Sequence, residues 1–286
     1  MSSLDPRLHP HREDLAAAYL KGRVAAKSFV EGTRHQVASG VVDLRRAPRD
    51  DATLDSQLLF GEEVNVYDRA GGWAWVQNNS DGYVGYVRAE ALSAEVHAAS
   101  HSLTALRSYL LSEPDLKSPA LDLLSISSPL AVAETRDGFS RLAGGGWVFS
   151  GHLAPLDETE ADHTATALAF RGAPYLWGGR SSLGLDCSAL VQIALARAGI
   201  FALRDTDMQE EILGAALAEA ETPARGDLVF LPDHVAIAVD AETVVHATAE
   251  VMAVAVEPLE ALDARSRKTN GRGVTAIRRP HAPAGA

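Results

Sequence analysis

Cysteine is almost absent from this sequence, since Cys187 is the only one among 286 residues. A single cysteine cannot form an internal disulfide, so the composition gives no sign of an oxidising compartment. Basic residues are in deficit too, with 26 lysines and arginines against 38 aspartates and glutamates and a formal net charge of −12. This excess of negative charge argues against nucleic acid or an anionic membrane surface as the main partner.

Long apolar runs are also missing. No stretch of about 18 apolar residues occurs, which is the length that a membrane-spanning helix needs. The opening residues, MSSLDPRLHPHREDL, are polar and lack the apolar core of a signal peptide. We therefore expect a cytoplasmic protein with no membrane partner. Because the chain also has no HExxH pattern and no pair of cysteines, we expect no metal and no other cofactor.

With 286 residues the sequence is long enough for two or three compact domains, and its apolar fraction of 47% is ordinary for a globular protein. Residues 13–27 are rich in alanine and place apolar residues at helical spacing, which predicts a short helix or an ordered arm. From Val41 onwards, short β-type runs alternate with Gly, Asp and Asn turns, which indicates a small antiparallel barrel.

An imperfect internal repeat indicates a second copy of this barrel. The segment VYDRAGGWAWV at 66–76 is echoed by ETRDGFSRLAGGGWVFSGHLAPL at 134–156. The aligned pairs are Gly72-Trp73 with Gly138-Phe139 and Gly85-Tyr86-Val87 with Gly146-Trp147-Val148.

The last part of the chain alternates between helix and strand, which predicts an α+β domain. Asp157 to Glu160 have the character of a capping box, so we expect a helix from there to Gly172. We further expect helices over 187–198 and 207–220 and strands near 227–231, 234–239 and 243–248. The predicted organisation is an arm or helix (1–35), a first barrel (36–95), a second barrel (96–156), an α+β domain (157–280) and a disordered tail (281–286).

Cys187 follows the loop GRSSLGLD and begins the apolar helical pattern CSALVQIAL. In the first turn of a helix, unpaired backbone N–H groups and the helix dipole favour a thiolate and can bind an oxyanion. On this local evidence a catalytic cysteine and a small buried apolar cysteine are equally good interpretations.

A cysteine nucleophile needs a base, and two of the ten histidines occur in predicted strands that a short turn joins. His234 starts the strand in GDLVFLPDHVAIAVD, and His246 lies in ETVVHATAE. In an antiparallel pair the two could lie close together, one as the base and the other holding its ring in the useful tautomer. By spacing alone, each also fits an ordinary strand histidine.

The three segments YLWGG…LDCSALV, GDLVFLPDHVAI and VVHA, in this order over about residues 165–250, resemble the NlpC-type cysteine peptidases, a papain-like family of cell-wall peptide hydrolases. The resemblance implies that Cys187 is the nucleophile, His234 the base and His246 the orienting residue. It also implies an oxyanion site made by the backbone N–H of Cys187 and the hydroxyl of Tyr175.

The two predicted barrels resemble bacterial SH3-like domains. In this combination the chain is similar to the subgroup of γ-D-glutamyl-L-diamino acid endopeptidases, which cleave murein peptides with a free N-terminal L-Ala. The implied partner is thus a small peptide, L-Ala-γ-D-Glu-diamino acid. The resemblance assigns its binding to Glu62, Tyr83, Trp177, Asp186, Ser188, Asp205 and Thr206. The physical logic is that a buried ammonium must be paired, which a group of carboxylates achieves.

Simpler interpretations stay open for several of these residues. Asp186 is suited to cap the helix that follows it, and Trp177 could belong to the core. Glu62 and Tyr83 also fit ordinary exposed strand residues, and a shift of register would exchange Tyr83 for Tyr86.

Three other functions also stay open: an inactive peptidoglycan-binding module, a papain-like acyltransferase or amidase, and an exported hydrolase of the intact wall. The sequence does not indicate the oligomeric state, nor whether the diamino acid is diaminopimelate or lysine.

Overall fold

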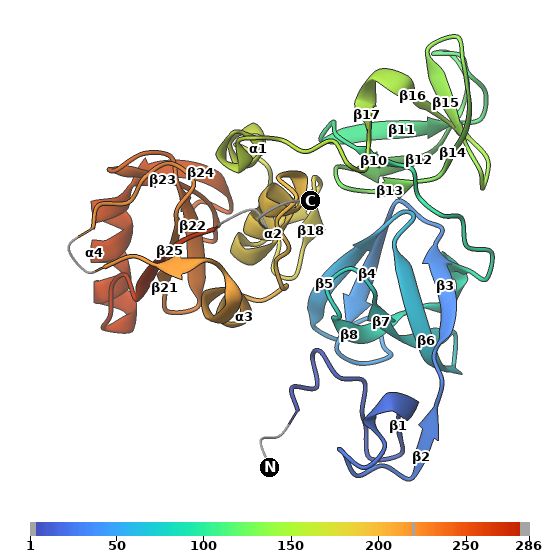
Figure 1. Cartoon of the computed structure of the whole chain (residues 1–286), viewed down its shortest axis with the longest axis horizontal. Coiled ribbons are helices and arrows are strands. Elements are labelled where there is room, and N and C mark those ends of the chain that lie inside the picture. Colours follow the sequence, from blue (N-terminus) through green and yellow to red (C-terminus); the bar gives the residue numbers. More distant parts are fainter. Residues whose placement is uncertain (1–3, 219–220, 281–286) are drawn as a thin grey trace. The chain divides into compact units, whose positions relative to one another are not determined.

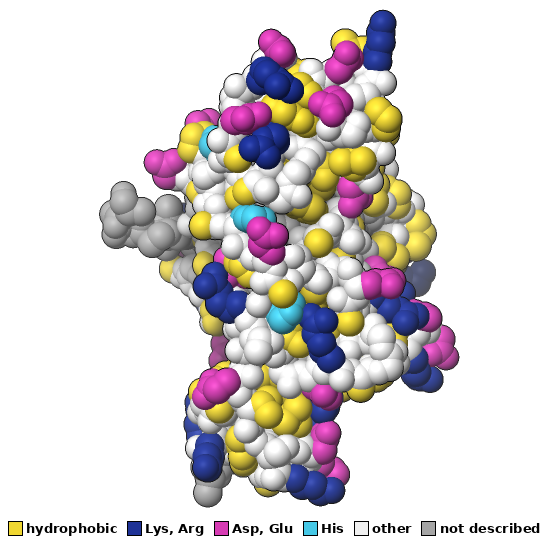
Figure 2. Space-filling model, turned by 90° about the vertical axis from the view of Figure 1, so that its right-hand side faces the viewer, with side chains coloured by type: hydrophobic (Ala, Val, Ile, Leu, Met, Phe, Trp, Pro, Cys, Tyr) yellow, Lys and Arg dark blue, Asp and Glu magenta, His cyan; other side chains and the backbone are white. Residues whose placement is uncertain are grey.

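The computed structural model describes residues 4–218 and 221–280, and the predicted tail at 281–286 lies outside them. The chain divides into two compact units, Met1–Leu156 and Asp157–Ala286 (Figure 1). None of the helices in the described ranges has the length and apolar character that a membrane span requires. On the face shown in Figure 2, acidic and basic side chains are interspersed with apolar ones.

The N-terminal unit begins with an ordered arm. It contains the parallel strands β1 (Leu15–Ala17) and β2 (Ser28–Val30) and a single 3-10 turn, Ala18–Leu20. The helix alternative for residues 13–27 is therefore wrong. Three consecutive residues of β1 are all buried, and the N–H of Ala17 bonds to the carbonyl of Pro10, so tertiary contacts override the helical preference of alanine.

The first barrel is a seven-stranded sheet in the order β5-β4-β8-β7-β6-β3-β9. Its strands are β3 (Thr33–Val37), β4 (Val41–Arg45), β5 (Leu54–Leu59), β6 (Glu63–Ala70), β7 (Trp73–Asn78), β8 (Val84–Arg88) and β9 (Leu92–Ser93), with a 3-10 turn at Ala89–Ala91. Alternate residues fill its core, and the close approach of β4 to β8 requires glycine. A Cβ on Gly85 would stand 2.2 Å from Cδ2 of Leu44.

The second β region repeats this strand order. It has a five-stranded sheet, β12-β11-β16-β15-β14, and a three-stranded sheet, β13-β10-β17, so that β13 and β14 together take the place of β6. Its strands are β10 (His101–Leu103), β11 (Arg107–Leu111), β12 (Ala120–Ser125), β13 (Pro129–Leu130), β14 (Val132–Arg136), β15 (Phe139–Leu142), β16 (Trp147–Phe149) and β17 (Leu153–Pro155), with a 3-10 turn at Ser150–His152. The aligned Gly72 and Gly138 occupy the same position, at the turn before β7 and before β15, with φ of 81° and 80°.

The C-terminal unit is built on a six-stranded sheet in the order β20-β25-β21-β22-β23-β24, and all its pairings are antiparallel. Its strands are β20 (Ala215–Ala216), β21 (Leu228–Leu231), β22 (His234–Ala238), β23 (Thr243–Thr248), β24 (Ala253–Pro258) and β25 (Ala276–Arg279). A short hairpin, β18 (Arg180–Ser181) and β19 (Gly184–Leu185), precedes the second helix.

Among the residues that the structure describes, four helices accompany this sheet: α1 (His163–Ala169), α2 (Cys187–Arg197), α3 (Thr206–Ile212) and α4 (Leu259–Asn270). Figure 1 draws α2 and α4 on opposite sides of the sheet. Leu262 of α4 packs with Ala236, Ala238 and Val244, so α4 covers the face to which these strand residues point.

Two predicted helices have other limits than expected. The first starts at His163 because Asp162, not the predicted box at 157–160, accepts the backbone N–H groups of Thr164 and Ala165. The helix expected over 207–220 ends at Ile212, and Gly214 then adopts φ of 62° and leads into β20. Strands β24 and β25 and helix α4 were not predicted.

Candidate active site

Cys187 is the first residue of α2, and Asp186 is the N-cap, with an extended backbone and a carboxylate that accepts the N–H of Ala189. The thiol is 8% exposed, and its Sγ lies 3.9 Å from Oγ1 of Thr206. Burial, with the negative charge of Asp186 as a second cause, raises the pKa of Cys187 to about 11. The free site therefore holds a neutral thiol at pH 7, despite its place at a helix N-terminus.

The two histidines of the sequence motif are in contact. In the register of β22 and β23, His246 lies diagonally across from His234, on the same face of the sheet. Nε2 of His234 lies 2.7 Å from Nδ1 of His246, and the rings meet edge to face. Burial, and next the neighbouring His246, lowers the pKa of His234 to about 3. Burial also lowers the pKa of His246, so both rings are neutral at pH 7.

One cavity of about 250 Å³ contains Cys187, His234 and Tyr175 among its lining residues. On its other side it is lined by the loop after β23 and by α4. Burial, and next the proximity of Cys187, raises the pKa of Tyr175 to about 12, so this phenol keeps its proton and can donate a hydrogen bond to an oxyanion. The arrangement thus provides a thiol, a neutral imidazole and a hydroxyl donor in one space, which is what acyl transfer by a cysteine requires.

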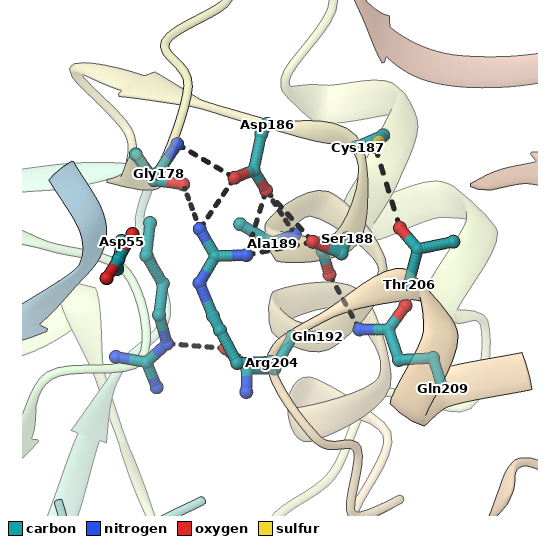
Figure 3. Close-up of polar contacts among 12 residues, drawn as sticks. Asp55, Gly178, Asp186, Cys187, Ser188, Ala189, Gln192, Arg204, Thr206 and Gln209 are labelled. Atoms are coloured by element: carbon teal, nitrogen blue, oxygen red, sulfur yellow. Dashed lines mark hydrogen bonds and ion pairs between the residues drawn. The ribbon is translucent and has the colours of Figure 1, made fainter. Parts of the chain in front are cut away.

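Asp186 is fully engaged by the protein itself (Figure 3). Its two oxygens accept from Gly178 N, Ser188 Oγ, Ala189 N and both terminal nitrogens of Arg204, the last at 2.9 and 2.7 Å. Arg204 is 1% exposed, so this is a buried ion pair. A carboxylate offers about four lone-pair sites. Asp186 therefore caps α2, as one of its two interpretations predicted. A direct bond from a substrate ammonium to this carboxylate would have to displace one of the present donors.

The other predicted binding residues of this unit lie near the start of two helices. Ser188 belongs to the same network, because its hydroxyl accepts from Arg204 and donates to Asp186. Asp205 is the residue before α3, and Thr206 is the first residue of α3 and the neighbour of the thiol. Trp177 is 64% exposed, so the alternative that it belongs to the core is wrong.

Glu62 and Tyr83 are buried in the N-terminal unit, at 5% and 4% exposure, so they are not ordinary exposed strand residues. Glu62 accepts the N–H of Leu59 and the hydroxyl of Ser80. Tyr83 and Tyr86 both line a cavity of about 700 Å³ beside the N-terminal arm, so the choice between them stays open. A role of either tyrosine, or of Glu62, in substrate binding stays a prediction.

Three residues of the site were missed at the level of sequence. One of them is Arg204, which directly precedes the predicted residue Asp205. Glu257 and Arg265 continue the line of polar contacts beyond His246, with Nε2 of His246 2.8 Å from Oε1 of Glu257 and Arg265 paired with the same carboxylate. The alternation in AVAVEP was a signal for a strand, but the position of Glu257 depends on the pairing of β24 with β23.

Comparison with known proteins places this geometry in a family. The model of the NlpC/P60 family matches residues 172–268. This chain carries an NlpC/P60 domain, of the cysteine peptidase class. A second model, described as a bacterial dipeptidyl-peptidase SH3 domain, matches residues 44–92. The resemblance to NlpC-type peptidases with an SH3-like domain is thereby confirmed, although a family model supports only the first of the two predicted SH3-like barrels.

Individual relatives are similar to this chain over most of its length. Dipeptidyl-peptidase 6 of Lysinibacillus sphaericus is 27% identical, over 84% of this chain and 97% of that protein. γ-D-Glutamyl-L-lysine dipeptidyl-peptidase of Bacillus cereus is 26% identical, over 72% of this chain and 71% of that protein. The solved structure of an NlpC/P60 family protein from Bacillus cereus superposes with a TM-score of 0.73, covering 87% of this chain and 99% of that one at 20% identity, which supports the fold.

Proposed function

We propose that this chain is a cysteine endopeptidase that hydrolyses the γ-D-Glu–diamino acid bond of murein peptides with a free N-terminal L-Ala. The observation that carries the proposal is the single cavity that Cys187, His234 and Tyr175 line, with His246 bonded to the base. The names of the relatives, dipeptidyl-peptidases of which one acts on γ-D-glutamyl-L-lysine, support this substrate class.

The chemistry follows from the neutral resting state of the thiol and the imidazole. As the sulfur of Cys187 attacks the γ-carbonyl of D-Glu, its proton passes to His234, and the oxyanion is held by Tyr175 and the first turn of α2. The C–N bond then breaks, and His234 returns the proton to the departing amine. A thioester remains. Water, deprotonated by His234, attacks the thioester, and the thiol is regenerated with release of L-Ala-D-Glu.

In this proposal fewer acidic residues bind the free amino terminus of the substrate than the resemblance implies. Because the carboxylate of Asp186 is filled by Arg204 and backbone donors, we assign Asp186 to shaping the site. Asp205 of the C-terminal unit and Glu62 of the other unit remain the predicted acids that would pair with the substrate ammonium, and at Glu62 such a bond would add to those that it accepts from Leu59 and Ser80. An acylated peptide would leave such a carboxylate without its partner, which would weaken its binding.

The diamino acid is proposed to occupy the part of the cavity that α4 and the loop after β23 line. This part adjoins His234, which protonates the leaving amine. It presents charges of both signs, Arg265 and Glu250, to a leaving group that itself carries carboxylate and ammonium groups.

The wider context is also a proposal. The second β region, with the strand order of the first, is proposed as a divergent SH3-like barrel, and the predicted domain limits are kept. A role in recycling wall peptides in the cytoplasm fits a substrate that is a short peptide with a free amino terminus.

The test compares two peptides that differ only at the amino terminus. L-Ala-γ-D-Glu-meso-diaminopimelate and its N-acetyl form are incubated with the protein, and the products are identified by mass spectrometry. We expect release of L-Ala-D-Glu from the free form only, and none with Cys187→Ala. Equal cleavage of both forms would contradict amine recognition but leave the peptidase in place. Absence of cleavage of either would contradict the peptidase and favour a binding module or an acyltransferase. The lysine peptide, run in parallel, determines the third residue.

A further inference from the structure

The polar contacts of the catalytic histidines continue to a charged pair on neighbouring elements. Glu257 of β24 is opposite Val244, so it lies on the same face of the sheet as His246. Its Oε1 is 2.8 Å from Nε2 of His246. Arg265 of α4 binds both oxygens of Glu257, with Nη1 2.9 Å from Oε2 and Nη2 on Oε1. This pair is not among the residues that the sequence resemblance assigned.

The charge state of Glu257 limits the tautomer of His246. Its pKa is lowered, first by the hydrogen bond from Arg265, so it is a carboxylate and can only accept. The side chain of His246 is fully buried, so Nε2 cannot form a hydrogen bond with solvent water. The contact is short but poorly aligned as a hydrogen bond. Even so, an unprotonated Nε2 would hold its lone pair close to a carboxylate oxygen 2.8 Å away, which is repulsive. Nε2 of His246 therefore carries the proton.

The tautomer of His246 determines that of His234. With the proton on Nε2, Nδ1 of His246 is an acceptor, and the atom 2.7 Å from it, Nε2 of His234, must be the donor. His234 then keeps its lone pair on Nδ1, which is the nitrogen left to take the proton of Cys187. With the opposite tautomers, Nδ1 of His234 would carry a proton and could not act as the base.

We propose that Glu257, held by Arg265, is a positioning residue that fixes the tautomers of both histidines so that His234 presents an unprotonated Nδ1 to Cys187. The kinetic part of this inference rests on the proposed peptidase function, whereas the tautomers are a property of the free protein. Glu257 has a second effect in the same direction. Its negative charge raises the pKa of both rings, whereas the positive charge of Arg265 lowers them. Glu257 is the larger influence of the two on His246 and Arg265 on His234, so this second effect acts on His246.

The experiment combines nitrogen NMR with thiol reactivity, neither of which needs the peptide substrate. Protein with ¹⁵N-labelled histidine is compared with Glu257→Gln, Arg265→Gln and the matched control Glu260→Gln, an exposed carboxylate of the first turn of α4. In the wild type we expect a protonated Nε2 and an unprotonated Nδ1 on both His234 and His246. In Glu257→Gln we expect a mixture of tautomers, and in Glu260→Gln the wild-type spectrum. The opposite tautomers in the wild type would overturn the proposal.

Alkylation of Cys187 by iodoacetamide, followed over pH, reports the base directly. We expect Glu257→Gln to slow alkylation near neutral pH about 10- to 100-fold, part of the about 10²- to 10⁴-fold that a general base contributes, and Glu260→Gln to leave it unchanged. Peptide hydrolysis should fall through kcat with little change in KM. Thermal unfolding confirms that each variant is folded. An unchanged rate and spectrum in folded Glu257→Gln would overturn the proposal. If the wild type fails to cleave murein peptides, only the proposed function fails, because the tautomers and the alkylation rate are measured without peptide.

Discussion

Five donors surround the two oxygens of Asp186, and one of them is the backbone N–H of Ala189 in the first turn of α2. Its place before an apolar helical pattern was enough to predict the cap. Its partner Arg204 is 18 residues further along the chain, and only the folded loops bring the guanidinium to the carboxylate. The assignment of Asp186 to the amine pocket came from resemblance, which compares residue types and contains no information on how many donors each oxygen has.

His234 and His246 were the part of the site that the sequence predicted best. The alternation of two adjacent strands defines which side chains share a face, and a short turn limits the register. Glu257 was not found in the same way because β24 itself was not predicted, although its connection to β23 is as short as that between β22 and β23.

The buried histidines make the fold sensitive to acid. Their pKa values are lowered in the folded state, that of His234 to about 3 from 6.5, so the unfolded chain binds more protons below about pH 6.5. Stability should therefore fall as the pH drops, by about 1.4 kcal/mol per pH unit for His234, and His246, whose pKa is also lowered, adds to this loss. Urea unfolding between about pH 6.5 and about pH 5, where most carboxylates stay ionised, measures this slope. The His234→Gln variant should take up about one proton fewer on unfolding, so its free energy of unfolding should depend less steeply on pH. A slope equal to that of the wild type would contradict the prediction.

At the scale of elements, the helices and strands that the sequence predicted correctly are those with the most buried residues. In α2 ten of eleven residues are buried, β21 and β22 are made almost wholly of buried apolar residues, and five of the six residues of β23 are buried, so their patterns are strong. Helix α4, LEALDARSRKTN, buries only Leu262 and Ser266, and β25, AIRR, has no fully buried residue. Such elements are held in place by their neighbours, which the local sequence does not specify.

Gly214 lies between the end of α3 and the start of β20, and its replacement tests whether close contacts fix the position of this boundary. Its φ is 62°, and a Cβ there would stand 2.1 Å from the carbonyl oxygen of Arg279. Gly271, after α4, has φ of 72° but open space around it. We expect Gly271→Ala to cost about 1 kcal/mol for the left-handed backbone alone, and Gly214→Ala about 1–3 kcal/mol more for the clash. Urea unfolding of both variants checks this. An equal loss of unfolding free energy in the two variants would show that the chain around Gly214 moves away from Arg279 without an energetic cost.

For the whole molecule, the order of domains was predicted mainly from the glycine-containing repeat and from the order of the motifs. Glycine turns at matching positions predicted a repeated β region, and the strand orders of the two regions agree. Three motifs in order predicted the NlpC/P60 domain, which the family model matches at 172–268. A contribution of one unit to the chemistry of the other is a different matter, because it depends on contacts between residues far apart in the chain and is visible in no local pattern.

Glu62→Gln tests this contribution, with the adjacent Glu63→Gln as the matched control. Glutamine keeps the shape of Glu62 and an oxygen for the N–H of Leu59, so the barrel should stay folded. Glu63 is half-buried and pairs with Arg34 on the barrel surface. If the carboxylate of Glu62 pairs with the substrate ammonium, its loss should raise KM for the free-amine peptide about tenfold, equivalent to about 1.4 kcal/mol, while kcat stays unchanged because the reacting bond is remote from the amine. Glu63→Gln should match the wild type. Equal KM values for the two variants, with both folded by thermal unfolding, would remove Glu62 from the substrate site and leave recognition of the amine to the C-terminal unit.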